Sequence, residues 1–223
     1  MNNTEKIISD EKIIMIVRGV GTEKLPMLAE AMWRGGIRLM ECTYDASGRI
    51  PDEVIAGGIE SLVSGFSGIM CIGAGTVLKS NQVRLTGAAG GSFIISPDTN
   101  EDIITETKSS GLISIPGALT PTEAMCAHRA GADFVKLFPV SQLGASYVKA
   151  LSAPLSHIRF LAVGGVGCEN LPSLLSAGAV GVGIGLNDRD RESIEQNDFE
   201  HIEAKCRKLT ETVRKWKELS SRA

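Results

Sequence analysis

The stretch Ala130-Gly-Ala-Asp-Phe-Val-Lys-Leu-Phe-Pro139 joins the end of an expected helix to a short apolar strand. A glycine between two alanines lets the chain leave a helix in a left-handed conformation and turn into the next strand. The run that follows is apolar on both faces, apart from one lysine, as in a parallel strand that is covered on both sides. This stretch therefore predicts one unit of an alternating strand and helix fold.

Similar pairs of small residues recur along the chain at Gly35-Gly36, Gly90-Gly91 and Ala177-Gly178-Ala179, with 55, 40 and 47 residues between successive last glycines. Each interval has room for two strand–helix units. Eight short apolar runs match this count: Ile13–Val17, Ile37–Cys42, Ile69–Gly73, Ser92–Ile95, Leu112–Ile115, Asp133–Phe138, Ile158–Val163 and Val180–Ile184. Eight units in 223 residues predict an α/β fold, a (β/α)8 TIM barrel in which residues 1–223 form a single domain. A doubly wound open sheet is the alternative, but eight parallel strands would be large for this length.

Two segments extend the barrel pattern. The charged stretch from Asp198 to Leu219 carries an apolar stripe at spacings of three and four residues, which predicts the last barrel helix. Residues 3–10 are expected to form a short extra helix across the bottom of the barrel.

Composition excludes several classes of protein. The net charge is −3 and the isoelectric point about 5.7, so no basic surface indicates binding to nucleic acid or to an anionic membrane. The five cysteines include no C-x-x-C pair, which favours a reducing compartment over a disulfide scaffold. The N-terminal residues lack the features of a signal peptide, and the apolar runs are far shorter than the roughly 20 residues of a membrane span. A soluble, cytoplasmic protein is expected.

Lys136 is the strongest candidate for chemistry. It lies near the end of its strand, where TIM barrels place their active sites. Alternation puts Lys136 on one face with Phe134 and Phe138, pointing into the barrel, and puts Val135 and Leu137 toward the helices. Burial lowers the pKa of a lysine and makes its amine a nucleophile toward a ketone. The alternative is a structural lysine paired with a carboxylate.

Glu41 is the second candidate, in the run Arg38-Leu-Met-Glu-Cys-Thr43. It shares a face with Leu39 and Thr43 near the end of the second strand. A carboxylate that points into the same barrel as Lys136 can transfer protons during imine formation and bond cleavage. Glu41 can equally be a salt-bridge partner of Arg18 or Lys136, and both interpretations can hold together.

Weaker signals lie at the other strand ends. Thr76 in Gly73-Ala-Gly-Thr-Val77 can donate to a carboxylate, and Arg18 is the best cation for an anionic substrate, unless it is a solvated loop residue. Glycines after the last two strands can bind phosphate through backbone N–H groups or simply form tight turns. The expected substrate-binding positions are Arg18, Thr76, Pro97, Phe138, Gly164, Gly165 and Gly185.

Six motifs, in order, resemble the 2-keto-3-deoxy-6-phosphogluconate (KDPG) aldolase / 4-hydroxy-2-oxoglutarate (KHG) aldolase family over nearly the whole chain. They are Gly36-Ile-Arg-Leu-Met-Glu41, Gly73-Ala-Gly-Thr-Val-Leu78, Ile95-Ser-Pro97, Ile115-Pro-Gly117, Phe134-Val-Lys-Leu-Phe-Pro139 and Val163-Gly-Gly165. The resemblance implies a class I aldolase without metal or other cofactor, which cleaves a 4-hydroxy-2-keto acid to pyruvate and an aldehyde. It also implies a homotrimer.

The resemblance further assigns roles to residues. It implies that Lys136 forms the Schiff base, that Glu41 is the general acid/base, that Thr76 holds the pyruvate carboxylate, and that Gly164 and Gly165 lie at the phosphate end.

Three positions depart from the family pattern. Asp45 stands where the pattern has arginine, Val163 replaces a threonine, and Leu186 replaces a serine. Since Asp45 is an anion in place of a cation, Arg18 is expected to take over the binding of the substrate anion. The resemblance therefore defines the pyruvate half of the substrate more firmly than the distal half.

Two other functions compete. A metal-dependent sugar-phosphate epimerase would need histidine and carboxylate ligands at several strand ends, whereas His128, His157 and His201 all lie elsewhere by this interpretation. A noncatalytic barrel that binds phosphate or a keto acid would fit the three departures. The presence of Lys136 and Glu41 argues against it, because a binding protein has no need of a buried amine.

Overall fold

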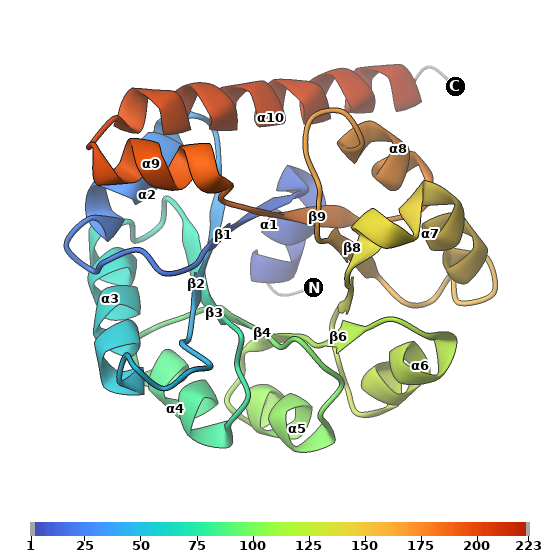
Figure 1. The fold of residues 1–223 in the computed structure, drawn as a ribbon. Coiled ribbons are helices and arrows are strands. Elements are labelled where there is room, and N and C mark those ends of the chain that lie inside the picture. The colour runs from blue at the N-terminus through green and yellow to red at the C-terminus, as the bar shows by residue number, and fades with distance from the viewer. Residues whose placement is uncertain (1–2, 222–223) are drawn as a thin grey trace.

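The computed structural model describes residues 3–221, and its parallel strands form a ring surrounded by helices (Figure 1). The strands are β1 (Ile13–Val17), β2 (Leu39–Thr43), β3 (Cys71–Gly75), β4 (Phe93–Ile95), β5 (Ile113–Ile115), β6 (Gly117–Ala118), β7 (Val135–Leu137), β8 (Phe160–Val163) and β9 (Gly181–Gly185). Their order around the ring is β5-β4-β3-β2-β1-β9-β8-β7-β6. The predicted TIM barrel is confirmed.

The fifth predicted strand, Leu112–Ile115, corresponds to β5, and Pro116 separates it from the short strand β6. Proline has no N–H to donate to a neighbouring strand, but its carbonyl accepts a 2.8 Å bond from the N–H of Lys136. The N–H of Phe134 donates to Ser114 O at 3.2 Å, so β5 also reaches the start of β7. The strand therefore ends at Ile115 as predicted, and the chain pairs again at Gly117 in a second short strand that was not predicted.

The helices surround the ring, most of them on its outer face (Figure 1). They are α1 (Asn3–Glu11), α2 (Leu25–Arg34), α3 (Asp52–Gly65), α4 (Ser80–Ala88), α5 (Glu101–Ser109), α6 (Pro121–Arg129), the short 3-10 helix η1 (Val140–Gln142), α7 (Gly144–Ser152), α8 (Leu171–Ser176), α9 (Asp188–Glu195) and α10 (Phe199–Ser220). Gly36, Gly90, Gly131 and Gly178 have positive φ, as the predicted turns require. None of the helices in residues 3–221 is long and apolar enough to cross a bilayer.

Two apolar cores follow from the alternation of side chains along each strand. The inner core fills the barrel and contains Ile8, Ile14, Leu39, Phe93, Ile95, Ile113, Ile115, Phe134 and Leu161. The outer core lies between the strands and the helices, and it includes Val135 and Leu137 as predicted.

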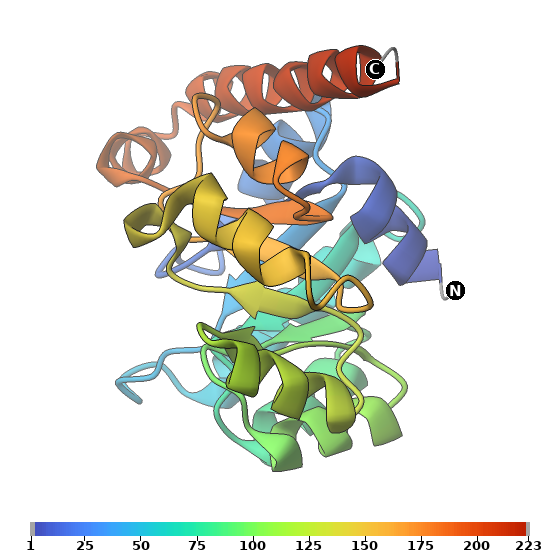
Figure 2. The same ribbon diagram turned by 90° about the vertical axis from the view of Figure 1, so that its right-hand side faces the viewer.

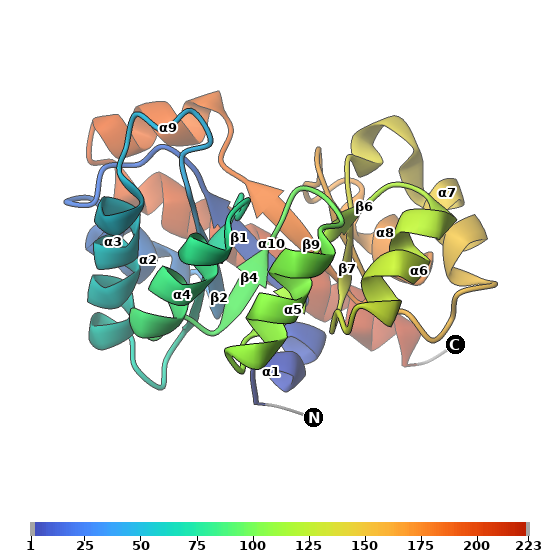
Figure 3. The ribbon, with the colours of Figure 1, turned by 90° about the horizontal axis from the view of Figure 1, so that it is seen from below.

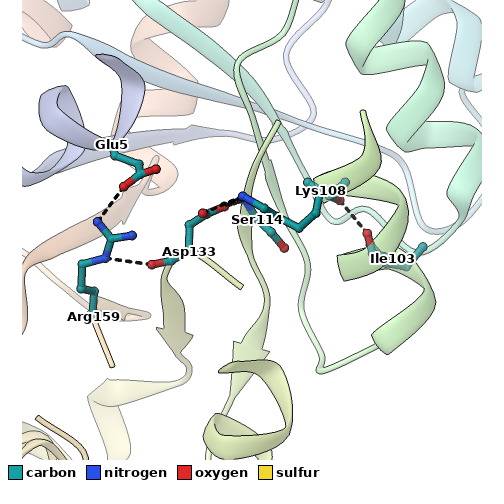
Figure 4. Close-up of polar contacts among 7 residues, drawn as sticks. Glu5, Ile103, Lys108, Ser114, Asp133 and Arg159 are labelled. Atoms are coloured by element: carbon teal, nitrogen blue, oxygen red, sulfur yellow. Dashed lines mark hydrogen bonds and ion pairs between the residues drawn. The ribbon is translucent and has the colours of Figure 1, made fainter. Parts of the chain in front are cut away.

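Helix α1 closes the bottom of the barrel, at the opposite end from α9 (Figures 2 and 3). Its Ile8 is 1% exposed and belongs to the inner core. Its Glu5 accepts a 3.0 Å bond from Arg159, whose Nε donates to the Asp133 carbonyl at 2.9 Å (Figure 4). The guanidinium also lies 4.2 Å from the centroid of the Phe134 ring. The predicted bottom helix is therefore confirmed.

The carboxylate of Asp133 continues this network toward α5. It accepts two 2.6 Å bonds from Lys108 Nζ and one of 2.8 Å from the N–H of Ser114 (Figure 4). These charged groups hold the N-terminal ends of β5 and β7 in place. The C-terminal ends of the strands, where active sites of this fold lie, are at the opposite end of the barrel.

Candidate active site

Lys136 and Glu41 both point into the barrel. Lys136 is the middle residue of β7 and is 8% exposed, and Glu41 is the middle residue of β2 and is 2% exposed. Phe134 and Leu39, two residues before each, belong to the inner core. Because side chains alternate along a strand, this places the amine and the carboxyl inside the barrel, above the inner core.

Burial dominates the acidity of Glu41. It raises the pKa of the carboxyl to about 7, against the opposing effects of the positive charges on Lys136 and Arg18. Its Oε2 atom is buried and has no hydrogen-bond partner in the described part of the chain. A carboxyl with such a pKa and a free oxygen can take up and release a proton near neutral pH.

Burial also lowers the pKa of Lys136. The nearby Glu41 carboxyl opposes this shift, Arg18 reinforces it and Asp98 opposes it. The Nζ atom lies 4.9 Å from the centroid of the Phe138 ring. Among residues 3–221 no carboxylate forms an ion pair with Lys136 at 4.0 Å or less, which argues against a purely structural lysine.

Gly75 leaves space for Glu41. A Cβ atom at residue 75 would lie 1.5 Å from Glu41 Oε1, and one at residue 73 would lie 2.4 Å from the Phe93 ring. The sequence suggested that small residues here let substrate approach the backbone. The structure shows instead that these two glycines accommodate side chains of the neighbouring strands.

Arg18 and Thr76 meet at the mouth of the barrel. Arg18 follows β1 and is exposed, and its Nη2 donates to Thr76 Oγ1 at 3.0 Å. Thr76 follows β3 with a φ of 55°, a left-handed conformation that is uncommon outside glycine. Such strained residues cluster at functional sites. A guanidinium and a hydroxyl thus lie together beside the catalytic candidates.

The remaining predicted positions surround the same end of the barrel. Pro97 is exposed after β4, Phe138 is 42% exposed after β7, and Gly185 is exposed at the end of β9. Gly164 and Gly165 follow β8 with φ of 96° and 69°. A Cβ at Gly164 would lie 3.2 Å from atoms of Phe138, so this glycine permits the β8 loop to approach the β7 loop.

Thr43 is a candidate that was not among the predicted site residues. It lies two residues after Glu41 on the same face of β2, is 6% exposed, and its hydroxyl bonds to no residue in 3–221. It lines a cavity of about 530 Å³ together with Arg18. The strand alternation that placed Glu41 inside the barrel also places Thr43 there, so Thr43 could have been predicted from the sequence.

Asp45, one of the departures from the family pattern, has a local role. Its carboxylate accepts bonds of 2.9–3.0 Å from the N–H groups of Ser47, Arg49 and Ile50, and also bonds to the Ser47 hydroxyl. These bonds lower the pKa of Asp45 to about 2. Asp45 therefore organises the β2–α3 loop, and its charge is satisfied there.

The histidines lie away from the strand ends. His128 and His157 stack edge to face at 4.9 Å, and His201 on α10 lies 3.3 Å from Asp190. Within the described ranges no three His, Cys, Asp or Glu side chains are grouped as a metal site would require. The histidine ligands that a metal-dependent epimerase needs are therefore not found at this end of the barrel.

Comparison with known proteins agrees with this geometry. The family model for KDPG and KHG aldolases matches residues 4–205. The chain belongs to this aldolase family. Both the resemblance deduced from the six motifs and the predicted enzyme class, a lyase, are confirmed by this match.

Related aldolases with similar sequences come from several bacteria. The chain is 41% identical over 128 residues to the 2-dehydro-3-deoxy-6-phosphogalactonate aldolase of Escherichia coli (strain K12), over 57% of this chain and 62% of that enzyme. It is 33% identical over 177 residues to a probable enzyme of the same name from Rhizobium meliloti (strain 1021), over 79% of this chain and 81% of the relative.

Solved aldolase structures share the fold. A structure described as native KDPGal has a TM-score of 0.81 and 30% identity, over 92% of this chain and 96% of its own. The KDPG aldolase of Legionella pneumophila has a TM-score of 0.81 and 27% identity, over 93% and 98%. That structure holds pyruvate captured at low pH as a covalent carbinolamine intermediate.

Proposed function

We propose that this chain is a class I aldolase that cleaves a 4-hydroxy-2-keto acid to pyruvate and an aldehyde through a Schiff base on Lys136. The observation that carries the proposal is the pair inside the barrel: a buried lysine whose pKa is lowered and a buried carboxyl whose pKa is raised to about 7. The pyruvate carbinolamine in the related Legionella enzyme supports the same chemistry.

The proposed reaction begins when neutral Lys136 attacks the C2 ketone. Glu41 transfers protons through its free Oε2 while the carbinolamine loses water and becomes a protonated imine. Glu41 then removes the C4 hydroxyl proton, directly or through water. The C3–C4 bonding pair moves into the imine, which leaves an aldehyde and a pyruvate enamine. Protonation at C3 and hydrolysis release pyruvate and restore the amine, and the imine itself is the electron sink, so no cofactor is needed.

The remaining residues of the site hold the ends of the substrate. Arg18 and Thr76, joined at 3.0 Å, bind the C1 carboxylate. Backbone N–H groups at Gly164, Gly165 and Gly185 bind a distal phosphate. Pro97 and Phe138 shape the walls of the mouth.

We further propose that the preferred substrate is 2-dehydro-3-deoxy-6-phosphogalactonate. Enzymes named for this substrate match the chain at 41% and 33% identity. Val163, the last residue of β8, stands where the KDPG pattern has threonine, so no hydroxyl is offered to the substrate there. The gluconate and galactonate substrates differ in configuration at C4, and a site distinguishes such epimers by the hydrogen bonds that it offers.

The test is release of pyruvate from each of the two C4 epimers by the parent and by Lys136→Arg. We expect kcat/KM at least about tenfold higher for the galactonate epimer. The arginine variant should lose about 10³-fold or more with both, because a guanidinium stays protonated. No pyruvate from either epimer would favour the noncatalytic barrel, and arginine-variant activity within about tenfold of the parent would remove Lys136 from its role. Equal rates with both epimers would overturn only the substrate preference.

The organisation of the protein belongs to the same proposal. We propose that residues 1–223 act as one aldolase domain, that three chains form a homotrimer, and that the enzyme is cytoplasmic. The family match over residues 4–205 supports the first. Exposed apolar side chains are available for subunit contacts, among them Met27, Trp33 and Leu119. All five cysteines are free, which suits a reducing compartment.

A further inference from the structure

Helix α9 contacts both ends of the loop that follows β1. At the first end, Arg191 Nη1 donates to the main-chain carbonyl of Arg18 at 2.8 Å. At the second end, Lys24 Nζ donates to the carbonyls of Ile194 and Glu195, in the last turn of α9, at 2.8 and 2.9 Å. The loop from Arg18 to Lys24 is therefore held at two points by one helix that comes much later in the chain.

The sequence of this loop gives it little rigidity of its own. It reads Arg18-Gly-Val-Gly-Thr-Glu-Lys24, and Gly19 has a φ of 68°, a conformation that glycine adopts readily. A segment with two glycines has more conformational freedom to lose on folding than other segments. The contacts with α9 therefore supply order that the loop sequence does not.

Helix α9 is itself fixed to the barrel by a buried carboxylate. Asp190 is fully buried and accepts the N–H of Asn187, at the start of α9, at 2.8 Å. From α10, Lys205 Nζ donates to the same carboxylate, and His201 Nε2 lies 3.3 Å from its Oδ1. Breaking a buried ion pair is strongly unfavourable, so α9 is a rigid support for Arg191.

The residue that α9 holds lies next to the reacting groups. Arg18 Nη2 donates to Thr76 Oγ1 at 3.0 Å. The positive charge of Arg18 also lowers the pKa of Lys136 and of Glu41. Because Arg191 binds the main chain of Arg18 and not its guanidinium, it fixes the origin of that side chain and leaves its N–H groups available to the site.

We infer that Arg191 is a positioning residue for the proposed reaction, because it fixes the main chain of Arg18 beside Lys136 and Glu41. The inference rests on the proposed function and adds to it a residue from a helix outside the ring of strands. Arg191 acts through Arg18, and Lys24 contributes in the same way from the other end of the loop.

The test is a double-mutant cycle of Arg191→Met and Arg18→Gln, measured as kcat/KM for pyruvate release from the C4 epimer that the parent cleaves faster. Arg191→Met should lower kcat/KM by about threefold to tenfold, as expected for one lost hydrogen bond. The double variant should match Arg18→Gln alone, because no guanidinium is then left to position. Arg191→Lys, which keeps a donor, should recover most of the loss. The exposed Arg34→Met on α2 is the matched control and should resemble the parent.

The pH dependence of kcat/KM distinguishes positioning from a loss of stability. Displacement of Arg18 removes a charge that lowers the pKa of Lys136 and of Glu41, so both pKa values rise. The pH profile of Arg191→Met should therefore move to higher pH, as that of Arg18→Gln does. A variant that is only less stable keeps the parental profile once rates are expressed per folded molecule. Lys24→Met removes the other contact and should move the profile in the same direction, and it carries the test if Arg191→Met does not fold.

Each other outcome removes a defined part of the account. Losses that multiply in the double variant would show that Arg191 acts independently of Arg18, which overturns the inference. A parental kcat/KM and pH profile for Arg191→Met would overturn it as well, while leaving the Schiff base intact. No pyruvate from the parent with either epimer would remove the proposed function, and this inference with it.

Discussion

Burial, more than any neighbouring charge, sets the properties of the two catalytic candidates. Glu41 has cationic neighbours that favour its charged form, yet its pKa rises to about 7 because water is excluded. The same exclusion lowers the pKa of Lys136. A site that lowers the pKa of the amine and raises that of the carboxyl to about 7 favours imine chemistry near neutral pH.

Because Glu41 is buried, the free energy of unfolding is expected to depend on pH. The folded pKa of Glu41, about 7, exceeds its ordinary value of 4.5, so the folded state holds the proton more tightly than the unfolded state. The stability that protonated Glu41 contributes is therefore present below pH 4.5 and is lost as the pH rises to about 7. Glu41→Gln has no such loss. Thermal unfolding should show the variant gaining stability relative to the parent across this window; a constant difference would contradict the raised pKa.

Gly75 is expected to be required for activity, because it leaves the space that the Glu41 side chain occupies. A methyl group at this position would overlap the Glu41 carboxyl, so Gly75→Ala should displace it and lower kcat by about tenfold or more. Gly57→Ala is the matched control, since Gly57 is exposed within α3 and nothing lies within 4 Å of the place that an added methyl group would take. Steady-state pyruvate release measures both. An alanine at position 75 with parental kcat would show that the carboxyl does not need its present place.

Periodicity in the sequence accounts for most of the elements. Continuous apolar runs and helix-ending glycines predicted the strands and the turns before β2, β4, β7 and β9, because both depend on local chemistry. Helix α9 was not predicted, since its sequence is mostly charged and buries only Asp190, Ser193 and Ile194. The short strand β6 was also not predicted, because its pairing depends on Lys136 in β7, which lies in the next strand–helix unit of the chain.

Within the site, too, the features that follow from local sequence were predicted and those that depend on folding were not. Strand alternation predicted that Lys136 and Glu41 share the barrel interior, and it also contained the signal for Thr43. The role of Asp45 could not be predicted, because the N–H groups that it accepts come together only when the loop folds. The sequence alone suggested that Asp45 opposes a substrate anion, whereas its charge is used within its own loop.

Helix α1 is expected to stabilise the barrel without contributing to catalysis. Ile8 enters the inner core at the bottom of the barrel, so Ile8→Ala should lower the free energy of unfolding by about 2–4 kcal/mol. The site lies at the opposite end, so kcat per folded molecule should stay at the parental value. Val54→Ala on α3, where the side chain is 45% exposed, is the control and should change stability by less than about 0.5 kcal/mol. Denaturant unfolding distinguishes them, and equal effects would show that α1 does not seal the core.

At the scale of the whole molecule, the two ends of the barrel have separate tasks. The bottom is closed by α1 and by the charged groups around Arg159 and Asp133 (Figure 4). The C-terminal ends of the strands carry the lysine, the carboxyl and the anion-binding donors. This separation leaves the sides of the barrel, with their exposed apolar residues, available for assembly.

The proposed assembly of three chains can be tested by its mass. A homotrimer should have a mass of about 71 kDa, three times the 23.6 kDa of the chain. Light scattering coupled to size-exclusion chromatography measures it directly. A mass of 23.6 kDa at micromolar concentration would contradict the trimer without affecting the chemistry proposed for a single barrel.

The central claim, a Schiff base on Lys136, is tested most directly by reducing the protein with borohydride in the presence of pyruvate and mapping the adduct by peptide mass spectrometry. The account predicts one reduced pyruvyl group per chain, on the peptide that contains Lys136, and none in Lys136→Arg. An adduct on another lysine, or no adduct at saturating pyruvate, would contradict it.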